Sequence, residues 1–304
     1  MTDRYTFNDL KNQYNFQRAE RLAYIDFRLR FMGVINRSDL SDLFGIADAA
    51  ASKEITEYRA LRPDNVIYDR VLRANTIVRE TFEPLMNINV ETALGMLANG
   101  FNKNKLVDNP LMPYQRVGQF PQQLDEDIVS KITRAINCQT AICCNYVSGA
   151  RSNLDERILL PTAIFYDGRS WKCRAYHRKT NTEESMFKCF NFSRFLNVEE
   201  RPYDIAKLHE TIERDRDWQL IVPIHLSVHP FADEHMQMGI RRDFGMREEQ
   251  SELVITERAA LVYFLIFNWG VDVSEDPIEE PRFSFHLKNA ESLKHINSIK
   301  NIFK

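Results

Sequence analysis

Residues 45–61 read GIADAAASKEITEYRAL and contain the most informative helix pattern in the N-terminal part of the chain. After the break at Gly45, apolar residues recur at i, i+4, i+7 and i+10, which is the spacing of one helix face. These residues are Ala51, Ile55, Tyr58 and Leu61. The spacing predicts a helix from about Asp48 to Leu61 that buries this face.

Two further helices are predicted upstream of this stretch. The apolar residues of Phe16–Phe31 fall on one helix face, and Gly33 follows as a stop signal. Asn36 or Ser38 can cap a short second helix. Its residues expected to face inward are Leu40, Leu43 and Phe44. The glycine turn after it lets the second and third helices meet steeply, as in a helix-turn-helix.

Downstream, Pro63 ends the third helix, and β-rich stretches follow at 66–68 and 76–78. The order is helix, short helix, glycine turn, helix and two-stranded wing. It predicts a winged helix-turn-helix DNA-binding domain over residues 1–80.

The outer face of the third helix combines small residues with hydroxyl and basic side chains, which suits close approach to phosphates and base edges. The predicted contacts there are Ser52, Lys53, Thr56 and Arg59. Arg70 and Arg73 on the wing would add backbone contacts. The alternative is a structural three-helix unit whose outer face is merely solvated.

Residues 81–123 are interpreted as a helical connector. Val90–Ala98 is predicted to be helical, and Asn, Lys, Pro and Gly dominate from Gly100 to Pro121. No chemistry is assigned to this segment.

Residues 124–200 have the pattern of one helix followed by an antiparallel sheet. Asp125 caps a helix with a stripe of isoleucines, and Asp167-Gly168 is a hairpin turn signal. The predicted strands begin at about Thr140 and then run over Arg157–Tyr166, Ser170–Arg178 and Met186–Phe190.

The strand Ser170–Arg178 alternates between two faces. One carries Trp171, Cys173, Ala175 and His177. The other carries Lys172, Arg174, Tyr176 and Arg178. Positive charge interleaved with an aromatic ring suits a nucleotide or single strand, with guanidinium on phosphate and a ring under a base. A solvated strand face is the alternative.

Residues 201–304 predict an α+β unit. It contains a strand over Trp218–Val228, a helix over Asp233–Phe244, a strand over Glu252–Thr256 and an apolar helix over Ala260–Phe267. The segment shows no catalytic pattern.

Length and charge support a modular chain in the cytoplasm. With 304 residues, 44% of them hydrophobic, the chain suits two or three domains. Its net charge of −3 is unevenly spread: residues 131–195 hold 11 basic against 5 acidic residues, and residues 196–304 hold 13 against 20. The uncharged run at 259–271 falls short of the roughly 20 residues of a membrane span. The N-terminus also lacks a signal-peptide pattern.

Several kinds of chemistry are not expected. The five cysteines lack metal-site spacing and are interpreted as buried thiols on strands, at positions 138, 143, 144, 173 and 189. His225, His229 and His235 have no Cys or carboxylate at a ligand-like offset, so no metal or other cofactor is predicted. Asp155-Glu156 and Glu183-Glu184 are interpreted as solvated turns, and no catalytic motif is present, so no enzyme is predicted.

Three groups of residues resemble a known family of bacterial regulators. The first runs from Tyr146 to Ser148, the second from Gly168 to His177 and the third from Phe190 to Phe195. Together with Pro161 they resemble the WYL domain, named for a Trp-Tyr-Leu triplet, although Lys172 and Cys173 follow Trp171 here. The C-terminal third, with its His-Pro pair at 229–230, resembles the extension that commonly follows WYL domains. The chain is most similar to regulators found beside phage-defence operons of the BREX and CBASS kinds.

The resemblance implies an Sm-like five-stranded small β-barrel for residues 124–200, a dimerisation extension over 201–304 and a homodimer on an inverted-repeat operator. It also implies a pocket for nucleic-acid fragments or nucleotides at Tyr146, Ser148, Arg174, His177, Arg178 and Arg194.

Together these features predict an α+β multidomain transcription regulator, more often a repressor, that binds double-stranded DNA as a homodimer and responds to an oligonucleotide or nucleotide effector. A nucleotide or single-stranded nucleic-acid sensor that acts through protein partners is the first alternative. A nuclease-like effector is the second, and the lack of metal-binding carboxylates disfavours it.

Overall fold

The computed structural model describes residues 4–107, 112–113, 124–148, 156–179 and 185–303. The chain divides into two compact units. The first contains Met1–Phe165 and Trp171–Ala206, and the second contains Tyr166–Ser170 and Lys207–Lys304.

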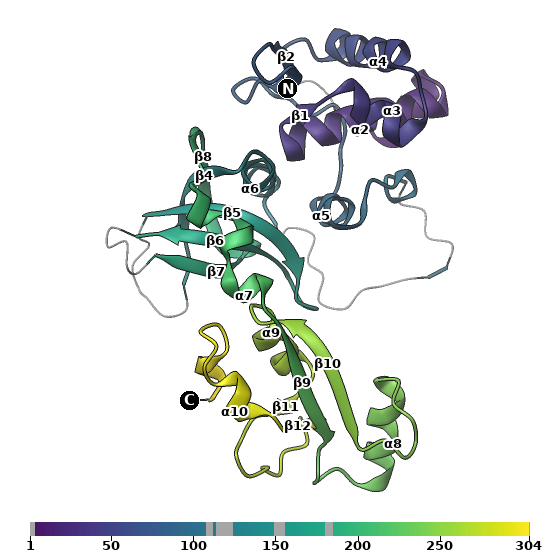
Figure 1. Ribbon diagram of the computed structural model, residues 1–304. Coiled ribbons are helices and arrows are strands. Elements are labelled where there is room, and N and C mark those ends of the chain that lie inside the picture. The colour runs from purple at the N-terminus through teal and green to yellow at the C-terminus, as the bar shows by residue number, and fades with distance from the viewer. Residues whose placement is uncertain (1–3, 108–111, 114–123, 149–155, 180–184, 304) are drawn as a thin grey trace. The chain divides into compact units, whose positions relative to one another are not determined.

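The N-terminal part of the first unit is a winged helix (Figure 1). Its helices are α1 (Phe7–Gln13), α2 (Phe16–Met32), α3 (Arg37–Phe44) and α4 (Asp48–Leu61). Its antiparallel sheet has the order β1-β3-β2, with β1 (Val34–Ile35), β2 (Val66–Asp69) and β3 (Ala74–Ile77). Gly33 and Gly45 end α2 and α3 at φ 78° and 63°, a left-handed conformation that glycine adopts without strain. The three predicted helices and the wing are confirmed, and α1 and β1 add to them.

A buried carboxylate holds α4 against the rest of the winged helix. Asp26 on α2 is fully buried and accepts hydrogen bonds from Tyr58 Oη at 2.7 Å and from the amides of Leu85 and Met86 at 2.9 and 3.1 Å. The Tyr58 hydroxyl accepts in turn from Asn65 Nδ2 at 2.9 Å. Burial raises the pKa of Asp26, and these donors oppose that effect.

The connector returns to the winged helix after α5 (Val90–Asn99). Phe101 places its ring 5.0 Å from that of Tyr24 and 5.5 Å from that of Phe27, both on α2. A short 3-10 helix, η1 (Lys103–Lys105), follows. The predicted helix is confirmed, and most of the segment between residue 107 and Pro121 lies outside the described residues.

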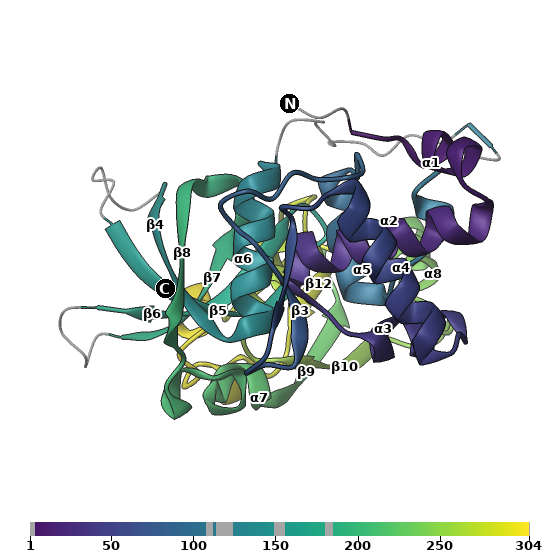
Figure 2. The ribbon, with the colours of Figure 1, turned by 90° about the horizontal axis from the view of Figure 1, so that it is seen from above.

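The second part of the first unit is a helix and a five-stranded sheet of order β7-β6-β5-β4-β8. The strands are β4 (Thr140–Tyr146), β5 (Glu156–Tyr166), β6 (Trp171–Arg178), β7 (Met186–Asn191) and β8 (Phe195–Ile205). Helix α6 (Glu126–Cys138) contacts β4 and β8 (Figure 2). Its N-cap is the predicted one, Asp125. The 3-10 turn η3 (Phe192–Arg194) precedes β8, a strand that was absent from the prediction.

The sheet is strongly curved, as a small barrel requires. β6 and β8 are three strands apart in the sheet order, which in a flat sheet is about 14 Å. Nevertheless Arg178 Nη1 on β6 lies 2.8 Å from both carboxylate oxygens of Asp204 on β8. The curvature therefore brings the end of β6 toward β8.

An ion cluster joins the winged helix to the sheet within the first unit. Arg134 on α6 is 5% exposed and donates to Glu200 of β8, at 2.6 Å from Nη2 to Oε2. Arg79, just after β3, donates to the same carboxylate at 3.1 Å. Arg134 Nη1 also donates to the carbonyl oxygen of Arg30 on α2 at 2.7 Å. One guanidinium thus connects α2, α6 and β8.

The second unit is an α+β fold with its own core. Its sheet has the order β10-β9-β12-β11, with β9 (Ile221–Val228), β10 (Glu252–Arg258), β11 (Val271–Asp272) and β12 (Phe285–Leu287). Its helices are α7 (Arg216–Gln219), α8 (Glu234–Asp243), α9 (Val262–Asn268) and α10 (Ala290–Leu293). The core packs around Ile224, Leu226 and Phe285. The predicted strand starts at Ile221 rather than Trp218, because Asp215 caps α7 over those residues.

Among the described residues, no helix is both long and apolar enough to cross a membrane.

Candidate nucleic-acid interface and ligand site

The outer face of α4 presents one basic and two hydroxyl side chains. Lys53 and Thr56 are exposed and Ser52 is half-buried. Ser52 Oγ donates to the Asp48 carbonyl, and Thr56 Oγ1 donates to the Ser52 carbonyl, both at 2.9 Å. While these bonds hold, the hydroxyls offer only lone pairs outward. They therefore suit the amino donors of adenine and cytosine rather than phosphate oxygens.

Arg59 lies at the edge of this face and is held by the wing. Its side chain is half-buried, and Nη2 donates to Oδ1 of Asn75 on β3 at 3.1 Å. This bond links α4 to the wing. In this conformation Arg59 positions the two elements, and it reaches a base only if it releases Asn75.

The opposite side of α4 is tied to α2 by ion pairs. Arg21 Nη1 lies 2.9 Å from Glu54 Oε1, and Arg18 pairs with Glu57. Glu54 is 7% exposed. Glu54 and Glu57 therefore face α2, whereas Asp48 at the start of α4 is exposed and accepts from Ser41 Oγ of α3 at 3.0 Å.

The turn between β2 and β3 carries the two wing arginines. Arg70 and Arg73 are both exposed, and Arg73 adopts φ 53°. Asp69 Oδ1 accepts from the amides of Val71 and Leu72 at 2.7 and 3.0 Å, which closes the turn. The arginines flank a two-residue apolar tip.

The residues predicted for the ligand pocket come from β4, β6 and η3 and lie on two different faces of the sheet. Tyr146 is 6% exposed, contacts Phe190 and Phe195 at ring distances of 5.1 Å, and accepts from the Asn191 amide at 3.0 Å. His177 lies 6.2 Å from the same Phe190 ring. Burial raises the pKa of Tyr146, and the exposed Arg194 beside it opposes the shift. Ser148 is half-buried beyond the end of β4.

The other predicted residues point to the opposite face because strand side chains alternate. Arg174 is 4% exposed, with Nη1 3.4 Å from Cys189 Sγ and the guanidinium carbon 5.9 Å from the Phe187 ring centroid. Tyr176 packs on the same ring at 5.1 Å. Lys172 is half-buried, and Arg178 pairs with Asp204. The structure therefore brings Tyr146, His177 and Arg194 together and places the basic strand face elsewhere.

Arg157 on β5 was not among the predicted ligand residues. Its guanidinium carbon lies 5.2 Å from the Tyr146 ring centroid. The residue pairs with Cys144 across β4 and β5, so it shares the face of Tyr146. Side-chain alternation would have indicated Arg157 only if the pairing register between β4 and β5 had been known from the sequence.

Side chains that could act in catalysis or bind a metal are dispersed, buried or hydrogen-bonded to other groups. No group of three His, Cys, Asp or Glu able to hold a metal occurs among the described residues. His229 lies 3.3 Å from Asp272, and both are buried. Burial raises the pKa of Cys144 to about 12, which makes its thiol unreactive. Asp155, Glu183 and Glu184 lie outside the described residues.

The five cysteines are free, and three are buried. Cys138 departs from the prediction of buried strand thiols: it is exposed and is the last residue of α6. Cys189 on β7 is half-buried.

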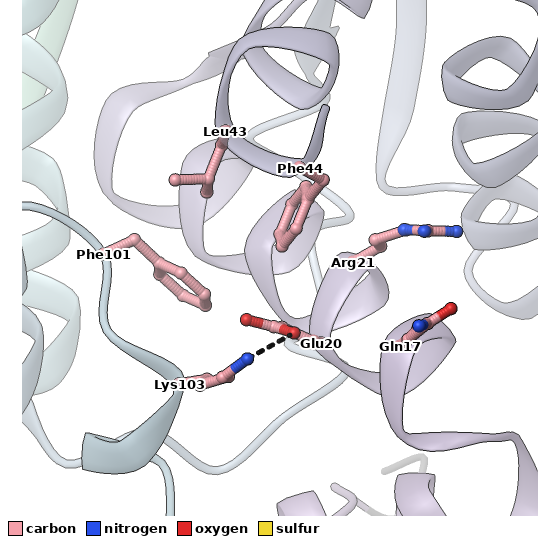
Figure 3. Close-up of a pocket in the computed structure, with 7 residues that line it drawn as sticks. All are labelled: Gln17, Glu20, Arg21, Leu43, Phe44, Phe101 and Lys103. Atoms are coloured by element: carbon pink, nitrogen blue, oxygen red, sulfur yellow. Dashed lines mark hydrogen bonds and ion pairs between the residues drawn. The ribbon is translucent and has the colours of Figure 1, made fainter. Parts of the chain in front are cut away.

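A cavity of about 320 Å³ lies in the first unit between α2, α3 and the connector (Figure 3). It is lined by Gln17, Glu20, Arg21, Leu43, Phe44, Phe101 and Lys103. Lys103 Nζ lies 3.5 Å from Glu20 Oε2 at its edge. Leu43, which was expected to face inward, is 43% exposed at this cavity. The cavity was not predicted because Phe101 and Lys103 belong to the connector.

The chain matches three family models in order. They are the BrxR transcriptional regulator winged helix-turn-helix domain at residues 17–99, the WYL domain at 127–200 and the BrxR transcriptional regulator C-terminal dimerization domain at 221–293.

Two curated relatives resemble it along almost the whole length. The DNA-binding transcriptional repressor CapW of Escherichia coli (strain KTE188) is 30% identical over 90% of this chain and 89% of its own. CapW of Pseudomonas aeruginosa is 30% identical over 91% of this chain and 90% of its own. A solved CRISPR Cas-related protein aligns with a TM-score of 0.31 and 11% identity, over 99% of this chain and 86% of that chain, which is too weak a similarity to interpret. The order of the three domains and the identity to the CapW proteins show that the chain belongs to the WYL-domain transcriptional regulators with BrxR-type winged-helix and dimerization domains.

Proposed function

We propose that this protein is a DNA-binding transcriptional repressor without enzymatic activity. The observation that carries the proposal is the outer face of α4, where Lys53 and Thr56 are exposed while Glu54 and Glu57 pair with arginines of α2. A recognition helix in the major groove needs such a face. The relatives named as DNA-binding repressors align with about 90% of this chain.

The proposed operator is an inverted repeat bound by a homodimer. The C-terminal unit matches a dimerization domain, and a two-fold protein presents its recognition helices to two half-sites about 34 Å or a multiple apart. The similarity to CapW makes a phage-defence operon the proposed target.

The proposed effector is an oligonucleotide or nucleotide held at Tyr146, His177 and Arg194, with Arg157 as an added cation. Aromatic rings and guanidinium groups gather there, as base and phosphate binding require. Helix α6 contacts α2 as well as β4 and β8, so a ligand that shifts α6 reaches the winged helix. Coupling of this kind is typically about 1–3 kcal/mol.

A gel shift on the DNA upstream of its own operon tests the proposal. The wild-type protein is expected to bind that fragment, and Lys53→Ala to bind it about 1–3 kcal/mol more weakly if the ammonium reaches a base edge. Lys300→Ala is the matched control, since that lysine is exposed on the C-terminal 3-10 helix η6 (Lys300–Phe303).

Equal affinity in Lys53→Ala and Lys300→Ala would refute the assignment of α4. If the wild type binds no double-stranded fragment but retains short single-stranded oligonucleotides, the chain is a sensor that acts through protein partners.

A further inference from the structure

The tip of the wing exposes two adjacent apolar side chains. Val71 is 92% exposed and Leu72 is 66% exposed. Neither contributes its side chain to the core of the winged helix, although the strand positions beside the turn, such as Ala74, are buried. On β2, Ile67 and Tyr68 are also exposed, at 59% and 52%.

The turn holds these side chains outward in a defined conformation. The Asp69 carboxylate accepts from both of their amides, at 2.7 and 3.0 Å, and Arg73 takes the left-handed conformation that closes the turn. A flexible loop would lose entropy on binding, whereas a turn closed in this way is already ordered. The apolar tip is thus preorganised for contact with a partner.

The charges around the tip select an anionic partner. Arg70 and Arg73 flank the apolar pair, and both are exposed. The Asp69 carboxylate is occupied by the backbone amides of the turn. One cation lies on each side of a short apolar wedge. This arrangement is complementary to a DNA groove, which has a phosphate chain along each edge. In minor-groove complexes, apolar wedges between base steps unstack the bases and bend the duplex.

We propose that Val71 and Leu72 insert as an apolar wedge into the minor groove of the operator and bend it, with Arg70 and Arg73 on the phosphates of the two strands. This inference rests on the proposed function and adds a second determinant of specificity to it. The pyrimidine–purine steps TA and CA/TG unstack most easily, so the wedge favours operators that carry such a step beneath the wing.

The test uses the full-length protein on its footprinted operator. Bending is measured by resonance energy transfer between dyes at the two DNA ends, and unstacking by the fluorescence of 2-aminopurine placed beneath the wing. Wild type is expected to shorten the end-to-end distance and raise the 2-aminopurine signal.

Two double variants separate the wedge from the charges. Val71→Ser with Leu72→Ser keeps both arginines and is expected to abolish bending and weaken binding about tenfold, with an unchanged salt dependence. Arg70→Ala with Arg73→Ala keeps the wedge and is expected to retain bending while the salt slope falls by about 2 per wing. All four side chains are exposed, so both variants should fold, and circular dichroism melts check this.

Other results would overturn the inference in distinct ways. If wild type binds the operator without bending or unstacking it, or if the serine variant bends it as wild type does, the wedge is wrong and the proposed function stands. If the serine variant loses its dimer in light scattering, the tip is a protein contact. If no double-stranded operator binds at all, the proposed function itself fails.

Discussion

Replacing Tyr58 by phenylalanine tests whether the buried carboxylate on α2 holds the recognition helix. The substitution removes one of the hydrogen-bond donors to Asp26 and the acceptor of Asn65 Nδ2, while Asn65 keeps its bond to the Glu83 carbonyl at 2.7 Å. A hydrogen bond to a buried charged group is worth about 1.5–3 kcal/mol. We therefore expect Tyr58→Phe to lower the free energy of unfolding of the winged helix by about 2 kcal/mol at pH values at which Asp26 is ionised.

The loss should depend on pH in a definite direction. The folded pKa of Asp26 is raised above its ordinary value of 3.8, so the folded state holds the proton more strongly, and stability falls as pH rises through the window above 3.8. Removing a donor to the carboxylate raises the folded pKa further. The difference between wild type and Tyr58→Phe is therefore smallest at low pH, where Asp26 is protonated in both, and grows toward neutral pH.

Hydrogen exchange of α4 amides in urea, read by mass spectrometry, measures this stability separately from that of the second unit. Tyr203→Phe is the control, because that side chain is 97% exposed. A loss in Tyr58→Phe no larger than in the control, or one that does not change with pH, would refute the role given to Asp26.

Three further predictions concern other parts of the chain. Burial alone would raise the pKa of Asp272, but hydrogen bonds from Ile278, Ser274 and His229 lower it to about 2. The stability that this carboxylate contributes is therefore present above its ordinary pKa and is lost as pH falls from about 4 to 2. Asp272→Asn should reduce this acid-induced loss of stability by about 2 kcal/mol in urea titrations of the second unit, and an unchanged loss would contradict the prediction. Phe101→Ala should destabilise the winged helix by about 2 kcal/mol, because the half-buried ring packs on α2, and an unchanged melting temperature would exclude this role. Arg194→Ala should no longer bind single-stranded oligonucleotides in fluorescence anisotropy but should keep its affinity for the operator. Arg174→Ala should instead lower the stability of the protein, because the Arg174 guanidinium is buried. Loss of operator binding by folded Arg194→Ala would contradict the assignment of Arg194 to the effector site.

Helices and strands were predicted correctly where their own residues show a clear stop signal or a regular apolar spacing. Gly33 and Gly45 end helices where the glycines predict, and Trp171, Cys173 and His177, which alternation along β6 assigns to one face, are all buried. The strand β8 escaped prediction because Glu199, Glu200 and Arg201 interrupt its apolar residues. Glu200 is tolerated there only because Arg134 and Arg79 neutralise it from elements more than 60 residues away.

The site was less predictable for the same reason. Lys53 and Thr56 are exposed as helical spacing implies, but Arg59 is held by Asn75 on the wing. Arg174 has the sequence signature of a solvated cation, yet Cys189 and Phe187 on the neighbouring strand bury it. The positions of such side chains depend on strand register and on packing between elements. The spacing of residues within one element does not contain this information.

Footprinting of the wild-type protein on the DNA upstream of its own operon tests whether the chain is a dimeric repressor that reads DNA through α4. We expect two protected half-sites in inverted repeat, about 34 Å or a multiple from centre to centre, with occupancy that falls steeply as salt is raised. Protection of a single half-site, or none at any salt concentration, would contradict a dimeric repressor that reads its operator through α4.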